Sequence, residues 1–422
     1  MGIKAFFKVD YYSKYVREWA EPVFFFLIFL FTVSNCLHHF TAVRNIAISL
    51  SGVLLFTLTK KQVIWAKFNT PILLPLLLLG MWAIIGMPFS SLDWVENVHD
   101  FVSHYLKYVL FYICLICTCN STKRLNILLW SIVIFFGAYY LWVMVDYYII
   151  WDRPITHRIG TNFKDVDYKE FAQNIEGFLT ITALFFSFML FKYCKNIYLR
   201  MVLILCITIF IAASIAPQSR GTILALIIST IIYFARHRII VISILLCVVL
   251  TLSLGNLPGR LDKKNFFSDS NRKNIFLFSM EVVKDAPILG HGFNIDVFED
   301  IRINNPEAYE NYKEKALVKK DYRYRAPHSS LLSILVRIGI VGLFFYLWII
   351  FAFYRMSLWG IMNGTLYNSD LSLSLLAAFS SFFIKSLFEP TFSHRPDTIF
   401  YMLLGLQSIL WLTGKKDDQK TI

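Results

Sequence analysis

Three ionisable side chains stand beside long apolar runs of this chain: Arg220, Arg272 and His328. A guanidinium grips a phosphate with two parallel hydrogen bonds, which makes phosphate a favourable partner for an arginine beside an apolar run. An imidazole close to two or more arginines binds its proton less tightly, which suits a general base near neutral pH. If the fold brings the three together, they could bind a phosphate and accept a proton.

Each of the three also has a purely structural explanation. Arg220 lies in the turn PQSRG and could cap a helix end. Arg272 could be an interfacial side chain that buries its stem and keeps its charge in water. His328 precedes Ser329 and Ser330, which could cap the helix that follows. The residue types alone leave both explanations open.

Weaker polar groups accompany these three. Arg158 lies near the pair Asp165 and Asp167, which could hold a divalent cation beside a pyrophosphate but is more typical of a solvated loop. Glu389 and Arg395 form another small group that could orient an arginine or a sugar. The longest loop ends in a basic stretch whose cations include Lys319, Lys320, Arg323 and Arg325.

The elements that must position these groups are membrane helices. The chain of 422 residues is 57% hydrophobic and only 16% charged. Several of its runs approach or exceed the roughly 20 apolar residues that cross a bilayer. We therefore predict an all-α polytopic membrane protein with about twelve spans, at residues 22–40, 42–59, 71–89, 101–119, 125–150, 173–191, 197–216, 220–235, 238–254, 329–354, 371–388 and 397–413.

The distribution of Lys and Arg predicts the orientation of these spans. With a cytoplasmic N-terminus, eighteen of these residues fall in the inside segments and seven in the short outside loops. Because cytoplasmic loops are enriched in Lys and Arg, both termini are predicted to be cytoplasmic. Arg220, Arg272 and His328 then share the outside face. Most of the net charge of +13 follows from this topology, so it requires no nucleic-acid partner.

Residues 255–328 form a 74-residue outside loop, which is too long for a simple connector. Within it, the segment 271–294 predicts a helix that stops at Pro287. We expect one face of this helix to lie against the bilayer or the bundle, and that face carries Arg272, Phe276, Ser279 and Val283. The predicted regions are thus spans 1–9 (1–254), the loop with its amphipathic helices (255–328), and spans 10–12 with a cytoplasmic tail (329–422).

The cysteines and the N-terminus exclude other classes of protein. None of the seven cysteines lies in the long loop, so that loop has no disulfide framework. Cys114, Cys117 and Cys119 lack an accompanying histidine or second cysteine pair, which favours buried helix residues over a metal site. The first apolar run is too long for a cleavable signal and lacks a small-residue exit, so we expect it to remain as an anchor.

Taken in order, three motifs resemble the O-antigen ligase family: SRGTILAL (219–226), NRKNIFLFSMEVVKDAPILGHGFN (271–294) and PHSSLLSILVRIGIVGLFFYL (327–347). The likeness covers the chain broadly, because that family also has twelve spans, cytoplasmic ends and a large periplasmic loop before the tenth span. It implies a GT-C-like fold. One departure is Ser329, which stands where many relatives have Asn, and this weakens any role for an amide beside His328.

The resemblance implies glycosyl transfer at the periplasmic face of the bacterial inner membrane. The donor would be O-antigen glycan on undecaprenyl pyrophosphate and the acceptor a sugar hydroxyl of lipid A–core. Arg220 and Arg272 match the arginines thought to hold the pyrophosphate, and His328 matches the proposed base of an inverting, metal-independent reaction that uses no cofactor. The basic stretch before His328 would then attract the phosphates of lipid A–core, or anionic lipid through the same forces.

Rival functions stay open beside the ligase. An O-antigen polymerase uses the same donor and a similar arginine-based site but joins glycan to glycan, and a protein O-oligosaccharyltransferase belongs to the same superfamily. A transporter or flippase of lipid-linked sugar would also suit twelve spans. The chain shows no obvious inverted repeat, however, and its polar residues gather on one face instead of lining a midplane path.

Overall fold

The structure is a computed structural model that describes residues 9–34, 40–58, 69–90, 93–119, 121–154, 159, 176–239, 241–243, 270–316, 324, 326–389, 392 and 395–420. All elements in these ranges are helices. Those of the first part are α1 (Val9–Val33), α2 (Thr41–Leu58), α4 (Leu73–Gly86), η4 (Met87–Phe89), α5 (Trp94–Phe101), η5 (Val102–Leu106), α6 (Lys107–Thr118), α7 (Thr122–Val145) and η6 (Asp146–Ile150). Those of the second part are α8 (Glu176–Tyr193), α9 (Ile197–Ile215), α10 (Arg220–Tyr233), α13 (Ser270–Asp285), α14 (Val297–Asn304), α15 (Pro306–Lys315), α16 (Ser330–Asn363), α17 (Leu366–Ser386) and α18 (Arg395–Lys420).

Apolar helices of membrane-spanning length dominate the fold. Among the described residues, four stretches are long and apolar enough to cross a membrane: Trp94–Thr118, Thr122–Ile150, Ile197–Ile215 and Ser330–Asn363. Several shorter apolar helices accompany them. The described part of the chain is therefore all-helical, and its apolar helices are those of a multi-pass membrane protein. The predicted ninth span lies mostly outside the described residues, and the count of twelve stays a prediction.

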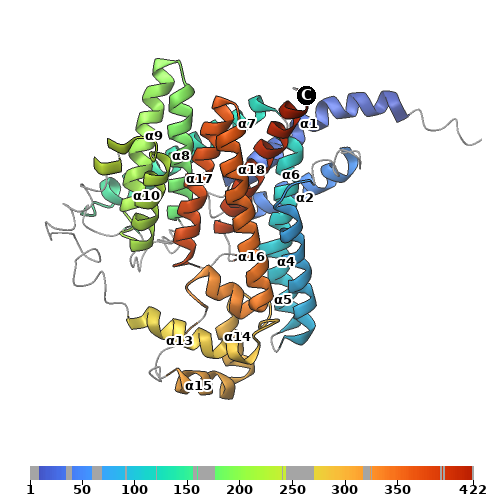
Figure 1. Ribbon diagram of the computed structural model, residues 1–422, viewed down its shortest axis with the longest axis vertical. Coiled ribbons are helices and arrows are strands. Elements are labelled where there is room, and N and C mark those ends of the chain that lie inside the picture. The colour runs from blue at the N-terminus through green and yellow to red at the C-terminus, as the bar shows by residue number, and fades with distance from the viewer. Residues whose placement is uncertain are drawn as a thin grey trace, which may run out of the picture.

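The long helices form a bundle, and α13, α14 and α15 lie together beyond one end of it (Figure 1). These three helices have a hydrophobic core of their own, to which α13 contributes Ile275, Phe278 and Val282, and α16 contributes Val336. Of the face predicted for α13, Ser279 and Val283 are buried against protein, while Phe276 is 49% exposed on the protein surface. The following helices of the same loop supply the apolar partners, so α13 buries a face rotated towards them.

Helix α16 is broken at Gly339, where φ is +73° and ψ is −173°. The turn Pro287–Gly292 lies against this break through three main-chain hydrogen bonds: His291 N to Val336 O, Gly292 N to Arg337 O, and Ile340 N to Pro287 O, each 2.9 Å long. The loop thereby satisfies backbone groups that the break removes from the helix, as is required of irregular backbone in a membrane protein. The continuous tenth span expected from the sequence is thus two helical segments.

The glycines at this junction are required by backbone geometry. Gly290 and Gly339 both have φ of +73°, a conformation that side-chain-bearing residues rarely adopt. A Cβ at Gly339 would also overlap the carbonyl group of Ile288. The glycines of the Pro287–Gly292 turn and Gly339 of α16 therefore allow the two backbones to pack closely against each other.

Candidate active site

Arg220 is the first residue of α10 and is half-buried. A tight turn after α9 places it there, in which Gln218 has φ of +47° and donates its N–H to Ile215 O at 2.8 Å. Ser219, in the N-cap position, has extended backbone. The turn predicted from PQSRG is therefore present, and it sets the arginine at the N-terminal end of an apolar helix.

Arg272 lies in the first turn of α13 and is exposed. Its guanidinium carbon is 5.0 Å from the centroid of the Phe388 ring, which is a cation–π contact. The same ring packs against the start of α10, because a Cβ built on Gly221 would lie only 3.0 Å from it. Phe388, which follows α17, thus contacts both the residue next to Arg220 and Arg272 itself.

His328 is exposed and lies just before α16. Two residues later, the Ser330 hydroxyl donates to the main-chain oxygen of Glu389 at 2.9 Å. Neither Ser329 nor Ser330 caps α16 with its side chain. The capping role suggested by the sequence is therefore wrong, and Ser330 instead ties the start of α16 to the residue after Phe388.

The pair Phe388–Glu389 is where the three predicted features meet. It contacts the first turns of α10 and α13 and the first residue of α16. Helix N-termini carry a partial positive charge and leave N–H groups unpaired within the helix, so this grouping favours an anion. Two arginines come from two of these helices, and the histidine directly precedes the third.

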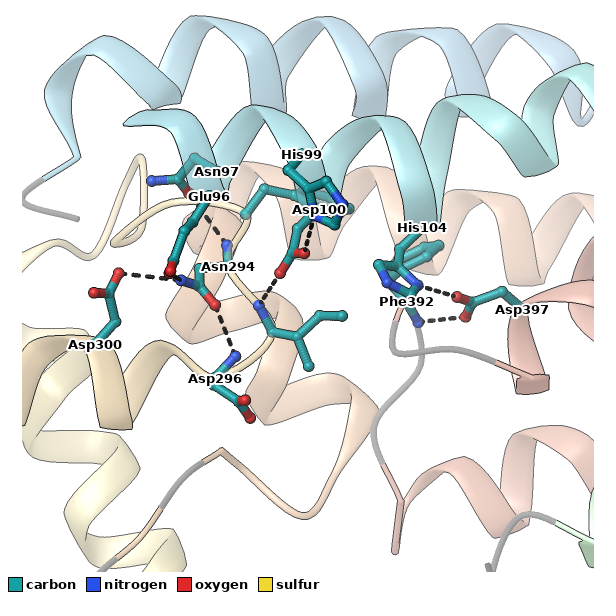
Figure 2. Close-up of polar contacts among 12 residues, drawn as sticks. Glu96, Asn97, His99, Asp100, His104, Asn294, Asp296, Asp300, Phe392 and Asp397 are labelled. Atoms are coloured by element: carbon teal, nitrogen blue, oxygen red, sulfur yellow. Dashed lines mark hydrogen bonds and ion pairs between the residues drawn. The ribbon is translucent and has the colours of Figure 1, made fainter. Parts of the chain in front are cut away.

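The connection from α17 to α18 is held by buried polar contacts that sequence reasoning missed. Phe392 is buried with φ of +57°, and its N–H donates to Asp397 Oδ1 at 2.7 Å. Its carbonyl accepts from Arg337 of α16 at 3.2 Å. The other oxygen of Asp397 lies 3.4 Å from Nδ1 of His104, as Figure 2 shows. These contacts fix the chain a few residues beyond Phe388 and Glu389.

A second polar network joins the loop to α5 (Figure 2). The Asn97 side-chain oxygen accepts from Asn294 N at 3.1 Å, and the Asn294 amide donates to Glu96 at 2.9 Å and to Asp300 at 3.1 Å. Burial raises the pKa of the Asp300 carboxyl, and the nearby Glu96 raises it further. This network anchors the segment between the Gly-rich turn and α14.

Other predicted site residues are only partly visible. Glu389 is half-buried, and its main-chain oxygen is the acceptor for Ser330. Arg395 begins α18, but its side chain is outside the described part. The remaining candidates lie outside the described residues: Arg158, Asp165, Asp167, Lys319, Lys320, Arg323 and Arg325. Within the described ranges, no three His, Cys, Asp or Glu side chains are grouped as a metal site.

A family comparison covers the part of the chain that contains all three helix starts. The model of the O-antigen ligase family matches residues 201–347. The chain carries a domain of the O-antigen ligase family. This domain includes Arg220, Arg272 and His328, so the resemblance seen in the sequence is confirmed. No curated protein matches the chain.

The O-antigen ligase domain ends within α16, before several residues that complete the site. Members of this family are glycosyltransferase-like enzymes that act on lipid-linked glycans. Phe388 and Glu389, which follow α17, and Asp397, in the first turn of α18, lie beyond the matched segment. The candidate site therefore draws residues from the matched segment and from the chain that follows it.

Proposed function

We propose that this chain is an O-antigen ligase of the bacterial inner membrane. It transfers an O-antigen glycan from undecaprenyl pyrophosphate to a sugar hydroxyl of lipid A–core, at a site that faces the periplasm. Arg220 and Arg272 bind the donor pyrophosphate, and His328 is the general base. This function differs from that of an O-antigen polymerase in its acceptor. A polymerase uses the same donor but joins glycan to glycan.

The meeting of three helix starts at Phe388–Glu389 is the observation that supports this proposal most. Phe388 lies 5.0 Å from the Arg272 guanidinium and packs on Gly221, next to Arg220. The hydrogen bond from Ser330 to Glu389 brings in the helix that His328 precedes. Residues from the starts of α10, α13 and α16 thus contact one pair of residues, although they are far apart in the sequence.

The reaction needs a leaving group held in place and a proton removed. The acceptor oxygen attacks the anomeric carbon of the glycan, and the bond from that carbon to the pyrophosphate oxygen breaks with inversion. The leaving pyrophosphate takes the electron pair, and fixed cations aimed at that charge lower the barrier. The hydroxyl proton passes to the imidazole of His328, a role worth about 10²–10⁴-fold in rate. A pyrophosphate leaving group requires no acid catalyst.

The acceptor would approach from the long loop. The basic stretch that ends this loop is well suited to the phosphate groups of lipid A–core, and its cations include Lys319, Lys320, Arg323 and Arg325. We assign these residues to acceptor binding on charge alone. The weaker candidates Arg158, Glu389 and Arg395 would contact the sugars or orient the arginines.

Deleting the gene and analysing both lipopolysaccharide and the undecaprenyl-linked pool tests this function. Loss of a ligase leaves bare lipid A–core while long polymer accumulates on the carrier. Loss of a polymerase gives lipid A–core with a single repeat unit, and loss of a flippase traps single units inside the cell. Either of the last two results contradicts the proposal.

Replacing His328 with alanine tests the base. We expect ligation to fall by about 10²–10⁴-fold while the protein still accumulates in the membrane. His99→Ala is the matched control, because His99 is also an exposed histidine, with its side chain 73% exposed, but lies on α5. Equal activity of the His328→Ala variant and the wild type would remove His328 from the mechanism.

A further inference from the structure

Lys385 is a buried cation on α17, one turn before Phe388. Its side chain does not reach out to the membrane surface, because the residue is only 1% exposed. The ammonium donates to Thr222 Oγ1 at 2.6 Å and lies 4.9 Å from the centroid of the Phe178 ring. It thus points into the bundle, towards the first turns of α10 and α8.

Gly177 provides the space that this ammonium occupies. A Cβ at Gly177 would overlap Lys385 Nζ and would lie 2.7 Å from Thr222 Oγ1. Gly177 is the second residue of α8, and Thr222 is the third residue of α10. The ammonium is therefore enclosed by the N-terminal turns of two helices, whose partial charges have the same sign as its own.

The position of Lys385 connects it to the proposed pyrophosphate site. Phe388 follows α17 in a turn in which its N–H donates to Lys385 O at 2.9 Å, and both residues contact the start of α10. Lys385 contacts Thr222, while Phe388 contacts Gly221 and the Arg272 guanidinium. The first turn of α10 thus begins with Arg220 and contacts two further residues. These are Lys385 and the Phe388 ring, which also contacts Arg272.

We infer that Lys385 is a third cation of the donor site and binds the phosphate groups of the lipid-linked pyrophosphate. This inference rests on the proposed function. Cations beside helix N-termini favour the binding of an anion, and a pyrophosphate carries several negative charges. An ammonium acts as a compact point charge beside the two flat guanidinium groups, so the three cations complement a ligand with two phosphates.

Binding of undecaprenyl pyrophosphate and of undecaprenyl phosphate to the purified protein tests the inference. We expect Lys385→Met to weaken the binding of undecaprenyl pyrophosphate by about 10-fold or more, as is typical of losing a hydrogen bond from a charged donor. The ratio of its affinities for the pyrophosphate and the monophosphate should also fall. Lys385→Arg keeps the cation and should retain most of the affinity. Gly177→Ala should weaken binding as Lys385→Met does, because the new methyl group displaces the ammonium. Lys107→Met, which removes a half-buried lysine on α6, is the control and should bind as the wild type does.

The outcomes separate this inference from the proposed function. If the wild type shows no preference for the pyrophosphate, the proposed donor itself is wrong. If the wild type prefers it and Lys385→Met binds equally well, Lys385 is no part of the site. A lowered melting temperature with unchanged affinity would make Lys385 a structural residue of the bundle and would overturn the inference. Should Lys385→Met fail to fold, wild-type affinity in Gly177→Ala would overturn the inference.

Discussion

Replacing Asp397 with alanine removes the acceptor that holds the α17–α18 connection. Its Oδ1 accepts the buried Phe392 N–H at 2.7 Å, and the carboxylate also attracts the buried Arg337, which donates to the Phe392 carbonyl. Losing a hydrogen bond to a charged group costs about 1.5–3 kcal/mol, and the Coulombic attraction of Asp397 for Arg337 is lost with it. We therefore expect Asp397→Ala to lower the free energy of unfolding by at least about 2–3 kcal/mol.

Asp397→Asn separates the hydrogen bond from the charge. The asparagine oxygen can still accept the Phe392 N–H, so this variant should lose only about 1–2 kcal/mol. Denaturant unfolding of the purified protein in detergent measures both variants. Glu21→Gln is the control, because Glu21 forms an exposed ion pair with Arg124 at 3.2 Å, and such pairs contribute less than about 1 kcal/mol.

The same variants report on the site. Phe392 has φ of +57°, which is strained for a residue with a side chain and persists only while the surroundings hold it. Once released, this connection no longer fixes Phe388, and ligation should fall more in Asp397→Ala than in Asp397→Asn. An Asp397→Ala protein as stable and as active as Glu21→Gln would refute the reasoning.

Three further outcomes follow from the loop and its junction with α16. Gly339→Ala should destabilise the protein by at least about 2 kcal/mol in the same unfolding assay, because φ is +73° and the new methyl group overlaps a carbonyl group. Gly52→Ala is the control and should have little effect, because its methyl group meets only the flexible side chain of Leu110. Burial lowers the pKa of His291 from 6.5, so on acidification the unfolded state takes up the proton first. The free energy of unfolding should therefore fall as the pH drops below about 6.5. In a His291→Asn variant, the denaturant midpoint should change less between about pH 7 and pH 5. Neutralising four loop cations together should raise the lipid A–core concentration needed for half-maximal ligation without changing donor binding, and an unchanged requirement would contradict their assignment; the four are Lys319, Lys320, Arg323 and Arg325.

Local features of the site could be predicted from the sequence. The turn before Arg220 and the helix that begins near Arg272 and ends before Pro287 follow from turn residues and hydrophobic periodicity, both of which act over a few residues. Four of the expected spans, 101–119, 125–150, 197–216 and 329–354, overlap helical stretches long and apolar enough to cross a membrane, because length and apolarity alone define a span. Each of these predictions depends only on neighbouring residues.

Long-range pairings could not be predicted in the same way. His104 and Asp397 are 293 residues apart, and nothing near either residue indicates the other. Lys385 could be recognised as an unusual charge in a span, but its contact with Thr222 depends on how α17 packs against α10. Phe388 is one of 40 phenylalanines, so its position between two arginine-bearing helix starts becomes apparent only in the folded chain.

The break in α16 defines which stretch of chain could be exchanged between related enzymes. Val336 belongs to the core of the loop helices, and Ile340 is the last residue that bonds to the Pro287–Gly292 turn. A chimaera that joined a foreign loop at the start of α16 would combine the Pro287–Gly292 turn of one parent with the α16 break of the other. Grafting residues 270–340 as one cassette keeps both sides of that joint from the same parent.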